Sequence, residues 1–234
     1  ALSGVEPVRE QPPAPAPRIS AVDPLAAALD WLQPLAAASG QAWPPPLPDA
    51  AELPEPLRRE LAILLGAIGS AYRQLDTATR RLPADLDANN LRAQALHGAP
   101  AARPGHDLLR LLPLLDRPQL AGGMIDLVDA VERFARFVAA SPSLPAIDWR
   151  LDTPLGMVIV DTTGRDDTRT LAAPLLLVDI GGNDRYTFTG RARTRRVAVL
   201  FDHGGDDRYR AAGDGADPSA ATLGYGVLWD SGGD

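Results

Sequence analysis

The sequence predicts an α+β protein in which an N-terminal helical bundle packs on a short C-terminal parallel β-solenoid. Apolar residues recur at helical spacing in the first part of the chain, whereas an apolar strand followed by Asp and Gly-Gly recurs in the last part. The composition changes with the pattern, because residues 151–234 contain 13 Asp, no Glu and 13 of the 21 Gly. Tight turns favour Asp and Gly, since a short side chain can bond nearby N–H groups and Gly accepts positive φ.

Residues 1–21 are predicted to form a Pro-rich extended arm. The run Gln11–Pro17 holds too many prolines to pack as a helix or a strand. Such an arm is either a terminus without a role or a strap that lies along a partner surface. Both alternatives stay open.

Residues 22–141 are predicted to form a helical domain. Its first helix begins at Asp23-Pro24, an N-cap followed by proline, and Gly40 marks its end. Trp43 lies in a Pro-rich connector and is expected to pack on the helical core. Apolar stripes then predict further elements over Pro56–Arg81, Leu86–His97, Leu108–Leu112 and Pro118–Ala140. The stripes have ordinary core spacing and include no cofactor motif.

The repeats are predicted to occupy residues 150–234. Two clear copies cover Leu175–Tyr186 and Ala198–Tyr209, and weaker ones begin at Met157 and Gly226. The Asp residues that end the four strands are 18, 23 and 28 residues apart: Asp161, Asp179, Asp202 and Asp230. Recurrence in this range is typical of a solenoid, in which each coil adds one strand to a parallel sheet.

The repeat strands are apolar at consecutive positions instead of alternating. Leu175–Val178 and Val197–Phe201 are examples. Continuous apolar runs are typical of parallel strands that are buried on both faces. The helical region is therefore expected to cover the outward face of the sheet.

Stacked coils would place equivalent aspartates about 4.8 Å apart, so like charges would form a column. Two unit charges at that distance repel by about 1 kcal/mol in water and by roughly 3–4 kcal/mol at an effective dielectric of 20. Backbone N–H groups of the Gly-Gly turn, the arginines Arg185 and Arg208, or bound Ca²⁺ could offset this repulsion. The candidate Ca²⁺ ligands are Asp179, Asp184, Asp202, Asp207 and Asp230.

The repeat resembles that of a group of uncharacterised bacterial β-solenoid proteins, with Asp-x-Gly-Gly-[Asn/Asp]-Asp-Arg-Tyr after an apolar strand. In that group it often follows Thr-Pro-Leu-Gly, as at Thr153–Gly156 here. More distantly, Gly-Gly-Asn-Asp and Gly-Gly-Asp-Asp are similar to the calcium-binding repeats of repeat-in-toxin proteins, which implies Ca²⁺. The third Gly of those repeats is missing here and the repeat is not nine residues long, so the calcium carry-over is the weaker implication. The resemblance covers residues 153–234 only.

The composition excludes several functions. Without Cys there is no disulfide, thiol nucleophile or thiolate metal site, and a net charge of −7 argues against nucleic acid as a partner. No apolar run reaches the roughly 18 residues that span a bilayer. One basic run is a solvated loop or a site for an acidic partner, and it contains Arg191, Arg193, Arg195 and Arg196.

We therefore expect a non-catalytic structural or docking protein, a scaffold subunit of a larger assembly. Association of that assembly with a membrane stays open. It would bind through its solenoid loops, its open last coil and its Pro-rich arm. The fourth copy stops at Asp234, so either more residues follow or that coil is open. An exported, periplasmic or cell-envelope location is favoured, and a cytoplasmic one stays open. The alternative is an exported glycan-binding or glycan-hydrolysing β-helix protein that uses aspartates on one solenoid face.

Overall fold

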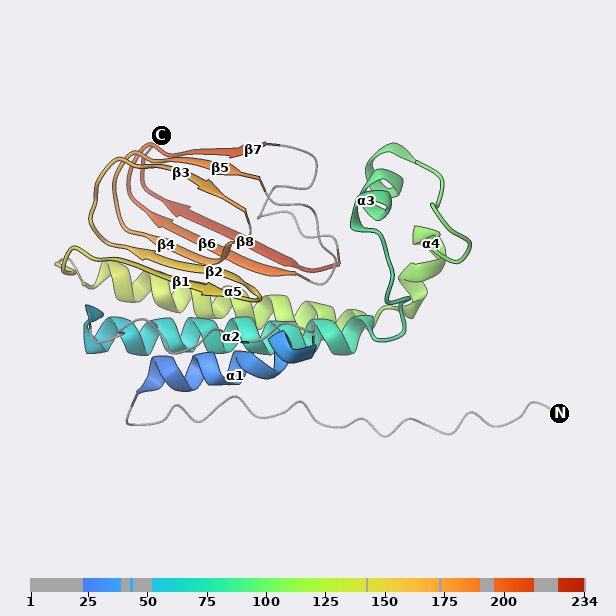
Figure 1. Ribbon diagram of the computed structural model, residues 1–234, viewed down its shortest axis with the longest axis horizontal. Coiled ribbons are helices and arrows are strands. Elements are labelled where there is room, and N and C mark those ends of the chain that lie inside the picture. The colour runs from blue at the N-terminus through green and yellow to red at the C-terminus, as the bar shows by residue number, and fades with distance from the viewer. Residues whose placement is uncertain are drawn as a thin grey trace.

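A computed structural model of the chain describes residues 23–38, 43, 52–141, 143–172, 174–189, 196–212 and 223–233. The predicted arm at residues 1–21 and the helix end at Gly40 lie outside these residues. The described chain is α+β, as predicted, with a layer of helices against two mostly parallel sheets (Figure 1). The helices are α1 (Pro24–Ala38), α2 (Glu55–Thr79), α3 (Ala88–His97), α4 (Leu108–Leu111), the short 3₁₀ helix η2 (Leu112–Leu114) and α5 (Arg117–Ala139). The strands are β1 (Asp148–Thr153), β2 (Gly156–Asp161), β3 (Thr168–Leu171), β4 (Pro174–Asp179), β5 (Arg185–Phe188), β6 (Val197–His203), β7 (Arg208–Ala211) and β8 (Tyr225–Ser231).

The helices begin and end within two residues of the predicted positions, and aspartate side chains cap the starts of α1, α3, α4 and α5. The Asp23 side chain accepts hydrogen bonds from the N–H groups of Leu25 and Ala26 at the start of α1. Asp116 accepts from the N–H of Gln119 in the same way and starts α5. The helix α3 ends at Gly98, whose φ of 62° is left-handed. Trp43 packs against the helical core, as predicted.

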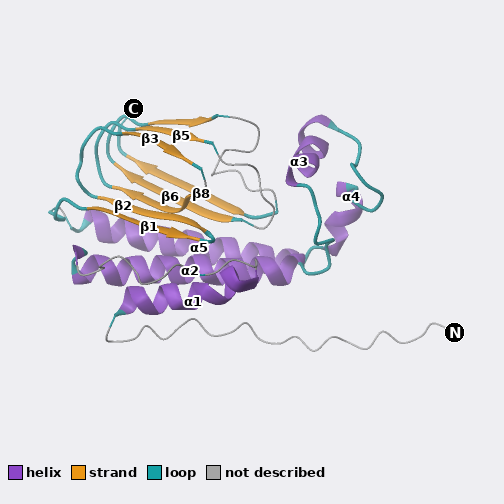
Figure 2. Cartoon of the chain, viewed as in Figure 1, coloured by secondary structure: helices purple, strands orange, loops and turns teal. Residues whose placement is uncertain are grey.

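The strands form two sheets, which Figure 2 shows as separate layers above the helices. The first sheet has the order β1-β2-β4-β6-β8, and the second has the order β3-β5-β7. The sequence predicted one strand per copy, and this was wrong. Each of three copies supplies one strand to each sheet, because the residues after the Gly-Gly turn are extended too.

The register of the first sheet follows the repeat. Asp161 pairs with Asp179, Asp179 with Asp202, and Asp202 with Asp230. The strand β1 pairs antiparallel with β2 and was not predicted as a strand. Its burial alternates, whereas all six residues of β4 are buried.

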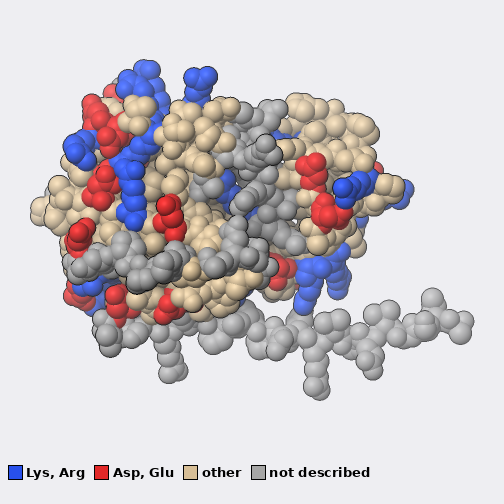
Figure 3. Space-filling model, in the orientation of Figure 1, with Lys and Arg blue, Asp and Glu red and all other residues tan. Residues whose placement is uncertain are grey.

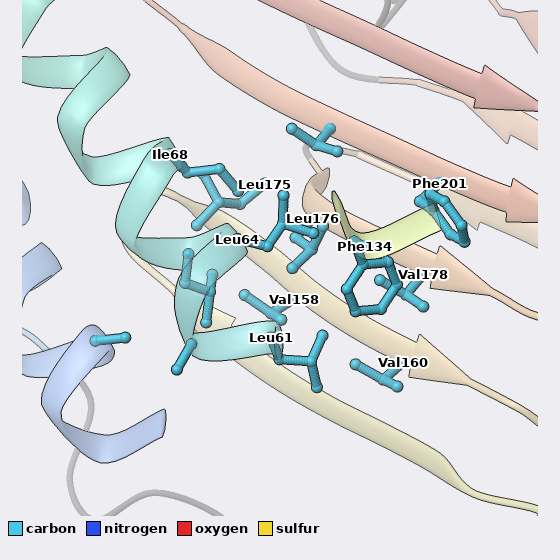
Figure 4. Close-up of a cluster of buried hydrophobic side chains, with 14 of the residues drawn as sticks. Leu61, Leu64, Ile68, Phe134, Val158, Val160, Leu175, Leu176, Val178 and Phe201 are labelled. Atoms are coloured by element: carbon cyan, nitrogen blue, oxygen red, sulfur yellow. The ribbon is translucent and has the colours of Figure 1, made fainter. Parts of the chain in front are cut away.

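Two cores explain why β4 is buried on both faces. Side chains of β2, β4 and β6 that face the helices pack with α2 and α5 in the larger core (Figure 4). The rings of Phe134 in α5 and Phe201 in β6 meet edge to face with centroids 5.0 Å apart. Ile159, Leu177 and Leu200 point the other way, into a smaller core between the two sheets. The predicted coverage of the sheet by helices is thus confirmed.

A small lobe extends beyond these layers and contains α3 and α4 (Figure 1). It has a core of its own around Leu82, Leu91 and Leu111. None of the helices in the described ranges is long and apolar enough to cross a membrane.

Candidate functional site

The candidate site is the carboxylate column at the end of the first sheet, where each strand turns back into the second sheet. We use this name for Asp161, Asp179, Asp202 and Asp230. The first three are only 2%, 2% and 1% exposed, whereas Asp230 is exposed. The column is thus taken out of water except at its last member.

Each of the three buried carboxylates has one donor from the second sheet. The hydroxyl of Tyr186 donates to Asp179 Oδ2 at 2.7 Å, and that of Tyr209 donates to Asp202 Oδ2 at 2.7 Å. In the first copy, Arg169 occupies the register position of Tyr186 and donates to Asp161 Oδ2. The Arg169 guanidinium also contacts Asp167 at 2.7 Å. A donor facing each carboxylate is what a buried column needs.

A second set of side chains joins neighbouring copies through backbone N–H groups. Asp184 Oδ1 accepts from the N–H of Asp167 in the preceding copy, and Asp207 Oδ1 accepts from the N–H of Asp184 at 2.7 Å. One residue earlier in each copy, the accepting side chain belongs to the preceding copy and the N–H group to the following one. There, Asp166 Oδ1 accepts from the N–H of Asn183 at 2.8 Å in the following copy, and Asn183 Oδ1 accepts from the N–H of Asp206 at 2.9 Å. These two ladders hold the turns of successive copies together.

The second glycine of each pair lets the turns approach this closely. The φ of Gly205 is 126°, which side chains rarely tolerate. A Cβ on Gly205 would also overlap the carbonyl oxygen of Gly182 in the preceding copy. Gly204 has a φ of 90° as well, but a Cβ there would meet nothing within 4 Å.

The protonation of the column differs between its members. Burial, together with the nearby charge of Asp184, raises the pKa of Asp179 to about 7, although the Tyr186 hydrogen bond opposes the shift. Burial and the charge of Asp207 likewise raise the pKa of Asp202 to about 7. Burial would also raise the pKa of Asp161, but hydrogen bonds from Thr163 and the Arg169 charge hold it below its ordinary value. Of the three buried carboxyls, only Asp161 accepts a hydrogen bond from a cation, and only its pKa lies below the ordinary value.

Some carboxylate oxygens of this region are buried without a donor in the described part of the chain. They are Asp184 Oδ2, Asp202 Oδ1 and Asp207 Oδ2. Burial raises the pKa of Asp184 and of Asp207 above the ordinary value. A proton on such an oxygen lowers the cost of burying it, because the neutral acid needs less solvation than the carboxylate.

The predicted Ca²⁺ ligands lie together at the turns, but they do not converge on one point. Among the described residues, no group of three or more His, Asp or Glu side chains could hold a metal ion. Asp179 and Asp202 face tyrosine hydroxyls, and Asp184 and Asp207 face backbone N–H groups. The Ca²⁺ hypothesis stays a prediction.

The donors of the column are not the arginines that the sequence suggested. Arg185 and Arg208 are exposed, and neither forms an ion pair with any described residue. Arg169 was missed because the first copy carries one extra residue in its turn, which hides its alignment with Tyr186. The two tyrosines could have been identified from their fixed distance of seven residues after Asp179 and Asp202. Charged side chains of both signs gather over the turns in the space-filling view (Figure 3).

Of the basic run, Arg191, Arg193 and Arg195 lie outside the described residues. Arg196 is described, and its guanidinium donates to the carbonyl oxygen of Pro174 at 2.8 Å. The Arg196 carbonyl in turn accepts from the N–H of Tyr225 at 2.8 Å. Arg196 thus joins β4, β6 and β8, and the proposed partner contact of the run stays a prediction.

Comparison of the chain with protein-family models, with curated proteins and with solved structures found no match.

Proposed function

We propose that this chain is a non-catalytic structural subunit, a scaffold that binds a partner within a larger assembly. The proposal rests on one observation: most carboxylates of the repeat are bonded to groups of the repeat itself. Three of the four carboxylates in the column are buried and accept hydrogen bonds from the second sheet, and Asp184 and Asp207 accept from backbone N–H groups of the preceding copy. Within the described ranges the outer side of β8 is unpaired and could serve a partner.

The proposal includes a short β-solenoid as the architecture of the repeat region. Successive copies pair in parallel in both sheets, with equivalent strand-end residues in register. Among the described residues, the turn ladders join each copy to its neighbours. These are the features of a stack of coils that grows in one direction. Such a stack is rigid and presents its edges and loops at fixed spacing, as a scaffold requires.

The docking surface is the edge of the first sheet at β8. Within the described ranges no strand pairs with the outer side of β8. An unpaired edge offers a row of backbone N–H and C=O groups to a partner strand. The Pro-rich arm and the basic loop would add contacts to the same assembly, and an envelope location would suit such a subunit.

Site-specific photocrosslinking in the native source tests this function. A photoreactive residue at Leu228 of β8 should capture one protein in a stoichiometric complex that survives purification in mild detergent. The matched control is Ile125 of α5, which is 59% exposed and belongs to the helix layer. A chain that captures nothing at Leu228, and that instead cleaves or binds members of a glycan panel, would contradict the proposal in favour of the glycan-active alternative.

A further inference from the structure

The second sheet has an outer face that turns away from the first sheet. Along β5, Tyr186 and Phe188 are buried in the smaller core, whereas Arg185 is exposed and Thr187 is partly exposed. The parallel register of β3, β5 and β7 places equivalent residues on the same face of the sheet. We call this outer surface the arginine face, and it consists of Thr168, Thr170, Arg185, Thr187, Arg208 and Arg210.

The exposure of the arginine face does not depend on an unpaired strand edge. The strand β5 is the middle strand of the second sheet and pairs with β3 on one side and with β7 on the other. Arg185 is nevertheless exposed, so its exposure comes from the open face of the sheet. Arg208 pairs in register with Arg185, and Arg210 pairs with Thr187. Both arginines of β7 therefore extend from the same face, whatever lies beside β7.

The arginine face gathers three positive charges without a matching negative one. Neighbouring strands lie about 4.8 Å apart, which separates the backbones of Arg185 and Arg208, and alternate residues of one strand are roughly 6.7 Å apart, as are Arg208 and Arg210. None of the three arginines forms an ion pair with a described residue. Basic side chains project above the second sheet in the space-filling view (Figure 3). Like charges at these distances repel, and bound carboxylates would offset that repulsion.

The charges around the arginine face favour a narrow acidic ligand over an extended anionic surface. A guanidinium binds the two oxygens of a carboxylate through a planar fork, and threonine hydroxyls beside it can donate to the same group. Asp166 and Asp206 are exposed at the turn end of the face, and the whole chain has a net charge of −7. An anionic bilayer would meet these carboxylates together with the arginines. A short segment can instead cover Arg208 and Arg210 and end before Asp206.

We propose that the arginine face binds an extended acidic segment of a partner protein, with carboxylates at alternate positions. Alternate side chains of an extended segment lie on one side and roughly 6.7 Å apart, which is the spacing of Arg208 and Arg210. A segment that runs along β7 therefore places one carboxylate on each of these two arginines. Arg185 contacts the first carboxylate from the neighbouring strand. This inference rests on the proposed function, because it adds a second contact surface of stated chemistry to the edge at β8.

The test measures, by fluorescence anisotropy, the binding of a labelled peptide that alternates Asp and Ser to the full chain. A peptide that alternates Asn and Ser is the neutral probe. We expect saturable binding of the Asp peptide that weakens as salt is added, and no binding of the Asn peptide. Arg208→Gln should weaken the binding of the Asp peptide about threefold to tenfold. The triple variant Arg185→Gln/Arg208→Gln/Arg210→Gln should abolish it.

The matched control is the triple variant Arg80→Gln/Arg81→Gln/Arg110→Gln, which removes three exposed arginines of the helical region. It changes the net charge by the same amount, so it should bind the Asp peptide as the wild type does. All the replaced arginines are exposed, so both triple variants should keep the urea midpoint of the wild type, which shows that they are folded. An equal loss of binding in both variants would mean that net charge governs binding, and it would overturn the inference.

Three other results would also overturn the inference. The first is the absence of saturable binding of the Asp peptide. The second is arginine-dependent binding of phosphatidylglycerol vesicles or of an oligogalacturonate by a chain that does not bind the Asp peptide. The third is a dimer in sedimentation that the arginine-face variant breaks, which assigns the face to a second copy.

The proposed function and this inference fail separately. If the Asp peptide does not bind but Leu228 still captures a protein in the native source, the proposed function survives and the acidic segment is ruled out. If the Asp peptide binds and Leu228 captures nothing, the arginine face is supported and the edge at β8 is not the docking surface.

Discussion

The two ends of the repeat array differ in how the carboxylate column ends. At the first end, Asp161 is buried against Arg169, and the column closes with a cation. At the last end, Asp230 is exposed and has no donor among the described residues. In between, tyrosine hydroxyls face carboxyls whose pKa is raised. The comparison teaches that a stacked acidic repeat can be buried when protons or a terminal cation neutralise it.

The two edge strands of the first sheet, β1 and β8, also differ in the side chains that they expose. The first edge is β1, which runs antiparallel and alternates buried Trp149 and Leu151 with the charged Asp148, Arg150 and Asp152. Charges on an edge strand discourage pairing with another chain. The last edge, β8, exposes Leu228 at its centre. Among the described strands, β1 thus carries charges that discourage pairing, whereas β8 exposes an apolar side chain.

The largest effect is expected at the first end of the column, where Arg169 contacts Asp161. Arg169→Met should lower the free energy of unfolding by about 3–5 kcal/mol, because it leaves the buried Asp161 carboxylate without its partner. Urea denaturation at pH 7 measures it. The matched control Arg185→Met removes an exposed arginine and should change stability by about 0.5 kcal/mol or less. Adding Asp161→Asn to Arg169→Met should recover part of the loss. Equal losses for both arginines would contradict the distinction between them.

The second prediction concerns the stability gained where the Gly-Gly turns of successive copies pack together. Gly205→Ala should cost about 3 kcal/mol, since it combines an unfavourable φ with overlap on the Gly182 carbonyl. Gly204→Ala has the unfavourable φ alone and should cost about 1 kcal/mol. The difference between the two urea midpoints isolates the close approach of the turns. If Gly204→Ala costs as much as Gly205→Ala, the stacking contact is not what fixes the second glycine.

The protonated middle of the column should make stability depend on pH. The folded state holds protons on Asp179 and Asp202 up to about pH 7, whereas the ordinary value for Asp is 3.8. The folded state therefore binds more protons than the unfolded chain in this window, and stability falls as pH rises. We expect each of the two carboxyls to contribute a loss of about 2–3 kcal/mol between pH 5 and pH 8. Asp179→Asn should remove about half of the pH dependence, and a flat wild-type profile would refute the protonated column.

The two tyrosine hydroxyls should contribute differently to stability, because they are buried to different degrees. Tyr186 is fully buried, whereas Tyr209 is half-buried. Tyr186→Phe should therefore cost about 1–2 kcal/mol, and Tyr209→Phe should cost less, because water can replace the lost hydroxyl there. Thermal unfolding of the two variants at one pH measures this order. The reverse order would mean that the last described copy is as well covered as the middle one.

The smallest effect is expected from removing divalent cations. Tyrosine hydroxyls, backbone N–H groups and Arg169 already offset the carboxylates, so excess chelator should shift the melting temperature only slightly. Differential scanning calorimetry with and without chelator checks this. A fall of tens of degrees that Ca²⁺ alone reverses would show that metal, and not these donors, holds the turns together.

Most of the fold could be predicted from local pattern. Helix bounds followed from caps such as Asp23 and Gly98, because capping depends on neighbours in the chain. The parallel register followed from the repeat, because equivalent residues must stack when equivalent strands do. The second sheet was missed because β3, β5 and β7 are four residues long and rich in Arg and Thr, which resembles loop composition.

The sequence by itself determined that carboxylates recur at the strand ends and that their strands are buried on both faces. Only the tertiary structure decided which groups neutralise them. The aspartates of the first sheet contact the Tyr or Arg side chains of the second sheet. Such contacts depend on the number of residues in the turn that connects the two strands. One extra residue in the first turn places Arg169 where the other copies have tyrosine. The charge of the column is therefore set by distances across the fold, which no local pattern encodes.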